Sequence, residues 1–177
     1  MRTPQAMTTD RIEACDVWEL ARRRGSVQGQ LSLKDTPRLA EQLADAAGAL
    51  RYRLDGLVDE LGRPAARLEV QGRVLARCDR CGAPVAVPIH ERAQFYFVGD
   101  EEELGKLPID ESEQEPLLGS RRFDLASLVE EQAILALPIS PRHEDCAAPA
   151  PAEQPPGPAG ETHRPFEALA ALRTPRG

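Results

Sequence analysis

The chain has no stretch close to the roughly 18 consecutive apolar residues that a membrane span needs, although 41% of its 177 residues are hydrophobic. The first ten residues are polar and contain no apolar segment of the kind that an export signal carries. Translation from Met1 and translation from Met7 both fit this pattern. We therefore expect a protein that stays in the cytoplasm and does not enter a membrane.

Aromatic residues are scarce at 4%, so the core must be mainly aliphatic. The known catalytic motifs are also missing: there is no nucleophile elbow, no phosphate-binding loop and no His-Glu-x-x-His sequence. Glu130 and Glu131 are adjacent on a predicted helix, so their carboxylates point apart and do not form an acid/base pair. We therefore expect a protein that is not an enzyme.

The net charge of −7 comes from one segment. Residues 100–116 contain eight acids and one base, whereas the remainder of the chain carries 21 of each. The acids are Asp100, Glu101, Glu102, Glu103, Asp110, Glu111, Glu113 and Glu115. Since this segment shows no hydrophobic periodicity, it predicts a solvated, flexible acidic loop over residues 99–120.

Alternating apolar and polar residues predict strands at residues 26–33, 50–55, 68–76 and 85–97. Gly72 suggests a bulge in the third of these strands, and Pro88 limits how central the fourth can be. Short turns separate the last three strands, which is typical of an antiparallel meander with one buried face. The sequence therefore predicts an α+β fold: an antiparallel β meander packed with a few helices.

Three helices are expected in this domain. One covers residues 16–23, and a second begins with Asp35 or Thr36 as its cap, continues along Leu39 and Leu43, and ends at Gly48. The third is capped by Asp124 and stopped by Pro138. Its apolar positions, with Gln132 as the exception, predict a well-buried helix. They are Leu125, Leu128, Val129, Ala133 and Ala136, widened by Ile134, Leu135 and Leu137.

The distribution of proline suggests how the chain is divided. We expect a disordered lead over residues 1–14 and a single α+β domain over residues 15–146 that contains the acidic loop. Five prolines lie between residues 147 and 160, which indicates a proline-rich linker over residues 147–164. Residues 165–173 then predict a short amphipathic C-terminal helix.

Two cysteines form a Cys-x-x-Cys motif between predicted strands, Cys78 and Cys81. A redox motif of this type opens a helix, and the two prolines within residues 83–88 do not allow one. Zinc needs four ligands, and His143 and Cys146 supply an imidazole and a third thiolate further along the chain. A zinc site of Cys78, Cys81, Cys146 and His143 and a set of free thiols both remain open.

Twenty of the 22 basic residues are arginine, which suits phosphate recognition better than lysine does. Several lie near the cysteine motif, and these predict a local basic face that could bind nucleic acid. The candidates are Arg73, Arg77, Arg80 and Arg92, with Arg63 and Arg67 beside them. The alternatives are a genome rich in G and C, and strands that simply direct arginine outward.

Three separated motifs carry a resemblance. They are residues 74–81 with the Cys-x-x-Cys, residues 123–143 followed by Cys146, and residues 165–172. Together they resemble the bacterial YceD family, the large ribosomal RNA subunit accumulation proteins, which also have chloroplast relatives. The resemblance extends over roughly residues 16–172, and the family's Cys-x-x-Cys and distal cysteine correspond to Cys78, Cys81 and Cys146.

The resemblance implies a role in the synthesis, processing or stability of 23S ribosomal RNA, and so in biogenesis of the large ribosomal subunit. The implied partners are precursor ribosomal RNA, a large-subunit ribosomal protein, or both. Two alternatives belong to other classes: an acidic chaperone that shields a basic ribosomal protein with residues 100–115, and an RNA-acting enzyme with a scattered site.

Overall fold

A computed structural model of the chain describes residues 14–107 and 114–148. The predicted lead before residue 14, the linker beyond residue 148 and the C-terminal helix lie outside the described residues. The strands are β1 (Ser26–Ser32), β2 (Leu43–Asp45), β3 (Ala49–Val58), β4 (Pro64–Arg77), β5 (Pro84–Val98) and β6 (Gln114–Leu118). The helices are α1 (Val17–Arg23), α2 (Pro37–Ala40), α3 (Glu101–Lys106) and α4 (Leu125–Leu135), with a 3-10 turn η1 (Leu33–Asp35).

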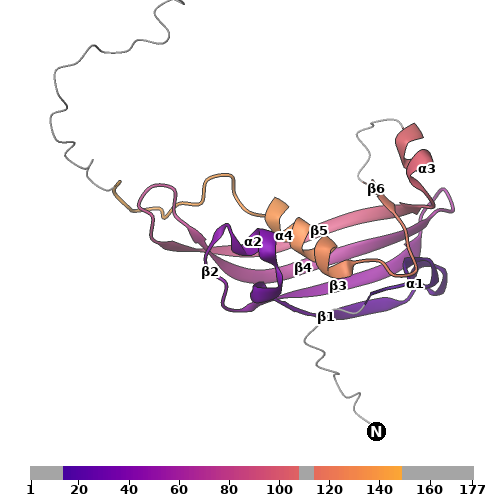
Figure 1. Cartoon of the computed structure of the whole chain (residues 1–177), viewed down its shortest axis with the longest axis horizontal. Coiled ribbons are helices and arrows are strands. Elements are labelled where there is room, and N and C mark those ends of the chain that lie inside the picture. Colours follow the sequence, from indigo (N-terminus) through magenta and orange to yellow (C-terminus); the bar gives the residue numbers. More distant parts are fainter. Residues whose placement is uncertain (1–13, 108–113, 149–177) are drawn as a thin grey trace, which may run out of the picture.

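The strands form one mixed sheet in the order β1-β3-β4-β5-β6, which confirms the predicted α+β class (Figure 1). Strands β3, β4 and β5 form the expected antiparallel meander, and β1 is antiparallel to β3. The alternation that predicted β3 is seen directly, since Leu50 and Leu54 are fully buried while Arg51 and Arg53 are exposed. One face of the sheet is therefore apolar and the other polar.

The acidic segment over residues 99–120 is not the unstructured loop that the sequence predicted. It contains α3, whose N-terminus is capped by the Asp100 carboxylate, which accepts a hydrogen bond from Glu103 N–H at 2.8 Å. It also contains β6, which pairs with β5 in parallel from Gln94 opposite Gln114 to Val98 opposite Leu118. The prediction was wrong because a parallel edge strand is recognised by its partner, and its own sequence shows no alternation.

Strand β4 continues through Gly72 in unbroken register with β5, so the predicted bulge is absent. A side chain at Gly72 would meet Leu50 Cδ2 at 2.7 Å, which explains the glycine as a place of close approach. Pro88 lies in the part of β5 that pairs only with β4, because β6 reaches no further than Gln94. The missing proline N–H therefore costs the sheet no hydrogen bond on that edge.

Helices α1, α2 and α4 lie over the apolar face of the sheet (Figure 1). The core between them is mainly leucine and valine, as the composition predicted. Its aromatic part is an edge-to-face group in which Phe97 meets Trp18 at 6.2 Å and Phe123 at 5.8 Å between ring centroids. This group joins α1 and the segment before α4 to β5.

The second predicted helix is much shorter than expected. Helix α2 ends at Ala40, and Leu43–Asp45 instead forms β2, which pairs with β4. Strand β3 pairs with β4 no further than Gln71, so the backbone of β4 beyond that point is free on one side. Strand β2 fills this position, and the sheet hydrogen bonds it gains override the helical spacing of the sequence.

Helix α2 is capped from a distance. Thr36 occupies the cap position, but its hydroxyl donates to Leu33 O at 2.8 Å, and its side chain does not cap the helix. The buried Glu130 carboxylate of α4 accepts instead from Arg38 N–H at 2.7 Å and Leu39 N–H at 3.0 Å. A carboxylate at a helix N-terminus satisfies otherwise unpaired N–H groups, so Glu130 joins α4 to α2.

Helix α4 begins at the predicted Asp124 cap, whose carboxylate accepts from Ser127 N–H at 3.0 Å. Leu128 and Val129 are buried as predicted, but Leu135 is 66% exposed and does not widen the apolar stripe. None of the helices in residues 14–107 and 114–148 is long and apolar enough to cross a membrane.

The closest backbone contact in the fold makes a strong prediction. A Cβ at Gly56 of β3 would lie 2.3 Å from Leu20 O and 2.5 Å from Leu20 C of α1. Because these are backbone atoms, α1 would have to shift, and we expect Gly56→Ala to lower the free energy of unfolding by about 3 kcal/mol. Urea denaturation would measure the loss.

Gly105 of α3 is the matched control, because a Cβ there meets nothing within 4 Å. Gly105→Ala should leave stability unchanged or raise it by up to about 1 kcal/mol, as alanine favours a helix. Equal urea midpoints for the two variants would contradict the close packing of α1 on β3.

Candidate metal centre

The Cys-x-x-Cys motif forms the turn between β4 and β5. Gly82 N–H donates to Cys78 O at 2.8 Å, and Cys78 N–H donates to Ala83 O at 2.9 Å. Gly82 has a φ of +75°, in the left-handed region that glycine adopts without strain. The turn therefore places Cys78 and Cys81 close together at the end of the hairpin.

The segment that follows α4 packs against this turn. Asp79 N–H donates to Pro141 O at 2.9 Å, and Arg80 Nη1 donates to Cys146 O, also at 2.9 Å. These two bonds connect parts of the chain that are more than 60 residues apart. They hold His143 and Cys146 over the hairpin.

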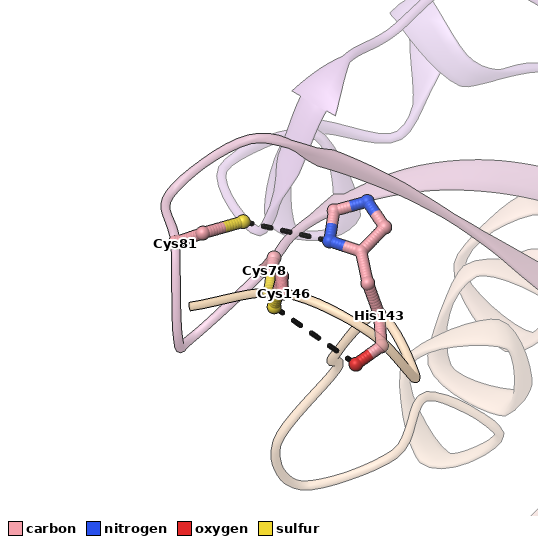
Figure 2. Close-up of side chains that lie close together, drawn as sticks. All are labelled: Cys78, Cys81, His143 and Cys146. Carbon is pink, nitrogen blue, oxygen red and sulfur yellow. Dashed lines mark hydrogen bonds between the residues drawn. The ribbon is translucent and has the colours of Figure 1, made fainter. Parts of the chain in front are cut away.

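The four predicted ligands come together in one metal-ligand cluster, consisting of Cys78, Cys81, His143 and Cys146 (Figure 2). Cys78 Sγ lies 3.6 Å from Cys146 Sγ, and Cys81 Sγ lies 3.5 Å from His143 Nδ1. All four ligand atoms lie within 4.8 Å of one another. Tetrahedral bonds of about 2.0 to 2.3 Å would separate the ligand atoms by about 3.5 to 3.8 Å, so the cluster can hold a metal ion.

The imidazole of His143 is oriented for ligation. Its Nε2 lies 3.0 Å from Pro84 O, a carbonyl that can only accept, so Nε2 carries the proton and donates. The neutral ring therefore has its lone pair on Nδ1, the atom that faces Cys81 Sγ. Fixing a ligand's tautomer through its second nitrogen is usual at metal sites.

The thiols do not titrate alike. Burial raises the pKa of Cys78, but backbone hydrogen bonds from Cys81, His143 and Arg80 outweigh it and lower the pKa to about 5. Burial raises the pKa of Cys146, and the neighbouring sulfurs of Cys78 and Cys81 raise it further. The protein thus stabilises one thiolate by itself, and further thiolates need a cation to offset their mutual repulsion.

The local structure does not match a dithiol redox site. Such a site lowers its thiol pKa with a helix N-terminus, whereas Cys81 is followed by a turn and then by β5. All four cysteines are free thiols, and no disulfide occurs among them. Cys15 is outside the cluster, since it forms an isolated bridge with Phe123 at the start of α1.

The predicted nucleic-acid residues are divided by the fold. Arg73 and Arg77 of β4 and Arg92 of β5 are exposed on the polar face of the sheet. Arg80 is not on that face, because it lies in the metal-binding turn and donates to Cys146 O. Arg63 is also separate: it lies in the β3–β4 turn with its guanidinium 3.5 Å from the centre of the Tyr96 ring.

Two arginines of the same face were missed at the level of sequence. Arg51 and Arg53 are exposed on β3, next to β4 in the sheet. Their alternation with Leu50, Tyr52 and Leu54 indicated an outward direction, but only the sheet order shows that they join the arginines of β4.

Comparison with known families agrees with this architecture. The sequence profile described as "Large ribosomal RNA subunit accumulation protein YceD" matches residues 66–173, which is more than half of the chain. The match includes β4, β5, α4 and all four members of the metal-ligand cluster. No solved structure matches the chain. The chain belongs to the YceD family.

Proposed function

We propose that this protein is a non-enzymatic factor that supports the synthesis, processing or stability of 23S ribosomal RNA in the bacterial cytoplasm, and thereby biogenesis of the large ribosomal subunit. The observation that carries the proposal is the family match over residues 66–173, since the family is named for accumulation of large-subunit ribosomal RNA. Its partner would be precursor ribosomal RNA, a large-subunit ribosomal protein, or both.

The absence of catalysis is part of the proposal. The buried carboxylate with the most unusual position, Glu130, is already engaged by two backbone N–H groups and by Arg38. His143 donates to Pro84 O and faces Cys81, so it belongs to the metal-ligand cluster and is not placed to act as a base. These arrangements support a structural role for the groups that could otherwise carry chemistry.

Zinc is the metal that fits the cluster best. Three thiolates and one imidazole in a tetrahedral arrangement are a usual ligand set for structural zinc. Four protein ligands leave no open position for water or substrate, which argues for a structural ion and against a catalytic one. The ion would fasten the β4–β5 hairpin to the segment after α4.

A second candidate is an acidic chaperone for a basic ribosomal protein. It is supported by the acidic first turn of α3, where Glu101, Glu102 and Glu103 are exposed side by side. Lys106 neutralises only Glu102 there, through a 2.6 Å ion pair. A chaperone of this kind would bind a basic protein with strong salt dependence and would not need the zinc cluster for contact.

Deleting the gene should lower mature 23S ribosomal RNA relative to 16S, and a wild-type copy should restore the ratio. A Cys78→Ser copy should restore it only in part, because loss of the metal reduces the amount of folded protein. RNA quantification with an immunoblot of protein abundance would test both effects. An unchanged 23S to 16S ratio after deletion, in slow and in fast growth, would overturn the proposed function.

A further inference from the structure

The polar face of the sheet carries a concentration of positive charge within a protein of net charge −7. This open face consists of the outward side chains of β1, β3, β4 and β5, and its charged members are six exposed arginines and two acids. The arginines are Arg51, Arg53, Arg67, Arg73, Arg77 and Arg92. The acids are Asp55 and Glu69, so the face has a net charge of +4.

Both acids of the open face are already paired. Asp55 binds Arg53 and Glu69 binds Arg92, each at 2.8 Å. Within residues 14–107 and 114–148 the other four arginines make no salt bridge. These are Arg51, Arg67, Arg73 and Arg77, and all four side chains are exposed. Their charge is therefore available to a partner.

No large helix covers the open face, because α1, α2 and α4 pack on the apolar side (Figure 1). Helix α3 covers only one end, where Leu104 and Leu107 pack on a small group of Ala65, Tyr96 and Val98. Between the arginines the face carries glutamines instead of an apolar groove. They are Gln28, Gln30, Gln71 and Gln94. A partner for this surface must therefore be polar and anionic.

The spacing of the arginines favours an extended polyanion. Arg67, Arg73 and Arg77 follow one strand, and ten residues of strand extend about 33 Å, far more than a single small anion needs. Guanidinium groups match phosphate geometry, and glutamine amides can donate to phosphate or accept from ribose hydroxyls.

The kind of nucleic acid contact is limited by what the face lacks. Its aromatic side chain, Tyr96, is buried beneath Arg63 and α3, so the described open face offers no platform on which bases could stack. Single-stranded binders depend on such stacking, whereas duplex binders use phosphates and ribose hydroxyls. The acids of α3 would repel phosphates at that end of the sheet.

We propose that the open face binds structured, double-helical RNA through its phosphate backbone, with Arg51, Arg67, Arg73 and Arg77 as the principal contacts. The inference rests on the proposed function only for the identity of the RNA as ribosomal. The charge, spacing and exposure of the face carry the rest.

The test is binding of the full-length protein to a fluorescent duplex hairpin transcribed from 23S ribosomal RNA, measured by anisotropy over a range of KCl concentrations. Four phosphate contacts predict a slope of log K against log salt of about −3.6. Arg67→Gln with Arg73→Gln should reduce the slope by about 2 and weaken binding about 10-fold or more at 100 mM KCl.

Arg22→Gln with Arg23→Gln is the matched control. Both arginines lie on α1, on the covered side of the sheet, and both pair with Glu19. The control removes the same charge and should bind within about twofold of wild type. Arg51→Gln with Arg77→Gln is a second test pair on the open face, and thermal melts of all variants would verify folding.

Three results would overturn this inference: no RNA binding by the folded wild type, equal loss in the control and test pairs, or binding of polyglutamate as tight as of the hairpin, which would indicate an acidic protein partner. The cell experiment separates it from the proposed function. If deletion lowers the 23S to 16S ratio but Arg67→Gln with Arg73→Gln restores it fully, the open face is not the contact and the function stands. If RNA binding behaves as expected but deletion leaves the ratio unchanged, the proposed function fails and the surface inference is supported.

Discussion

Cys78→Ser is expected to reduce bound zinc from about one ion per chain to a small fraction of that, and to lower the melting temperature by about 10 °C or more. A serine hydroxyl is a poor zinc ligand at neutral pH, so the variant keeps three ligands and an open position. Cys78 is also the sulfur that backbone hydrogen bonds favour as a thiolate, with a pKa of about 5. Its loss removes the anion that the protein prepares best for the metal.

Elemental analysis of untagged protein, with thermal melts before and after a chelator, would measure both effects. Cys15→Ser is the matched control, because Cys15 joins Phe123 through backbone hydrogen bonds of 3.1 and 2.8 Å that serine preserves. The control should retain its zinc and melt close to wild type. Negligible zinc in the wild type, with all thiols titrating freely under native conditions, would disprove the metal site.

The composition of the metal-ligand cluster was predictable because ligand chemistry depends on residue type. Cys78 and Cys81 needed two more ligands, and the nearby pair of His143 and Cys146 was the best remaining source. The orientation of the site was not predictable. The bond from His143 Nε2 to Pro84 O depends on how the segment after α4 crosses the hairpin, and that crossing is a tertiary contact.

Local patterns succeeded where a strand's neighbours were also its sequence neighbours. The β3–β4–β5 meander follows from alternation and short turns. The patterns failed at β2 and β6, since each is defined by pairing with a distant strand: Leu43 lies opposite Ala76, and Gln114 lies opposite Gln94. A free strand edge can impose β structure on a sequence with little preference of its own.

The role of Glu130 shows the same limit at the level of one side chain. Adjacent acids on a helix read as solvent-exposed, and Glu131 is indeed exposed. Glu130 is buried because α2 ends beside it and presents two N–H groups to its carboxylate. The burial of a charge is determined by its partner, which sequence spacing does not reveal.

Leu128→Asp should unfold or aggregate the domain. Leu128 is 6% exposed and packs in the main core beneath α4. An aspartate there would either remain charged in an apolar site or expose the core, and we expect it to lower the free energy of unfolding by about 4 kcal/mol or more. That loss is comparable with the whole stability of many small domains.

Leu135→Asp on the same helix isolates the cause. Leu135 is 66% exposed, so the same change of residue should alter stability by no more than about 0.5 kcal/mol. Helix propensity and net charge change equally in the two variants, which leaves burial as the difference between them. Soluble expression and thermal melts would compare the pair. If both variants melt together near wild type, the Leu128 face of α4 is not part of the core. If both unfold, α4 is intolerant of aspartate for a reason other than its packing on the sheet.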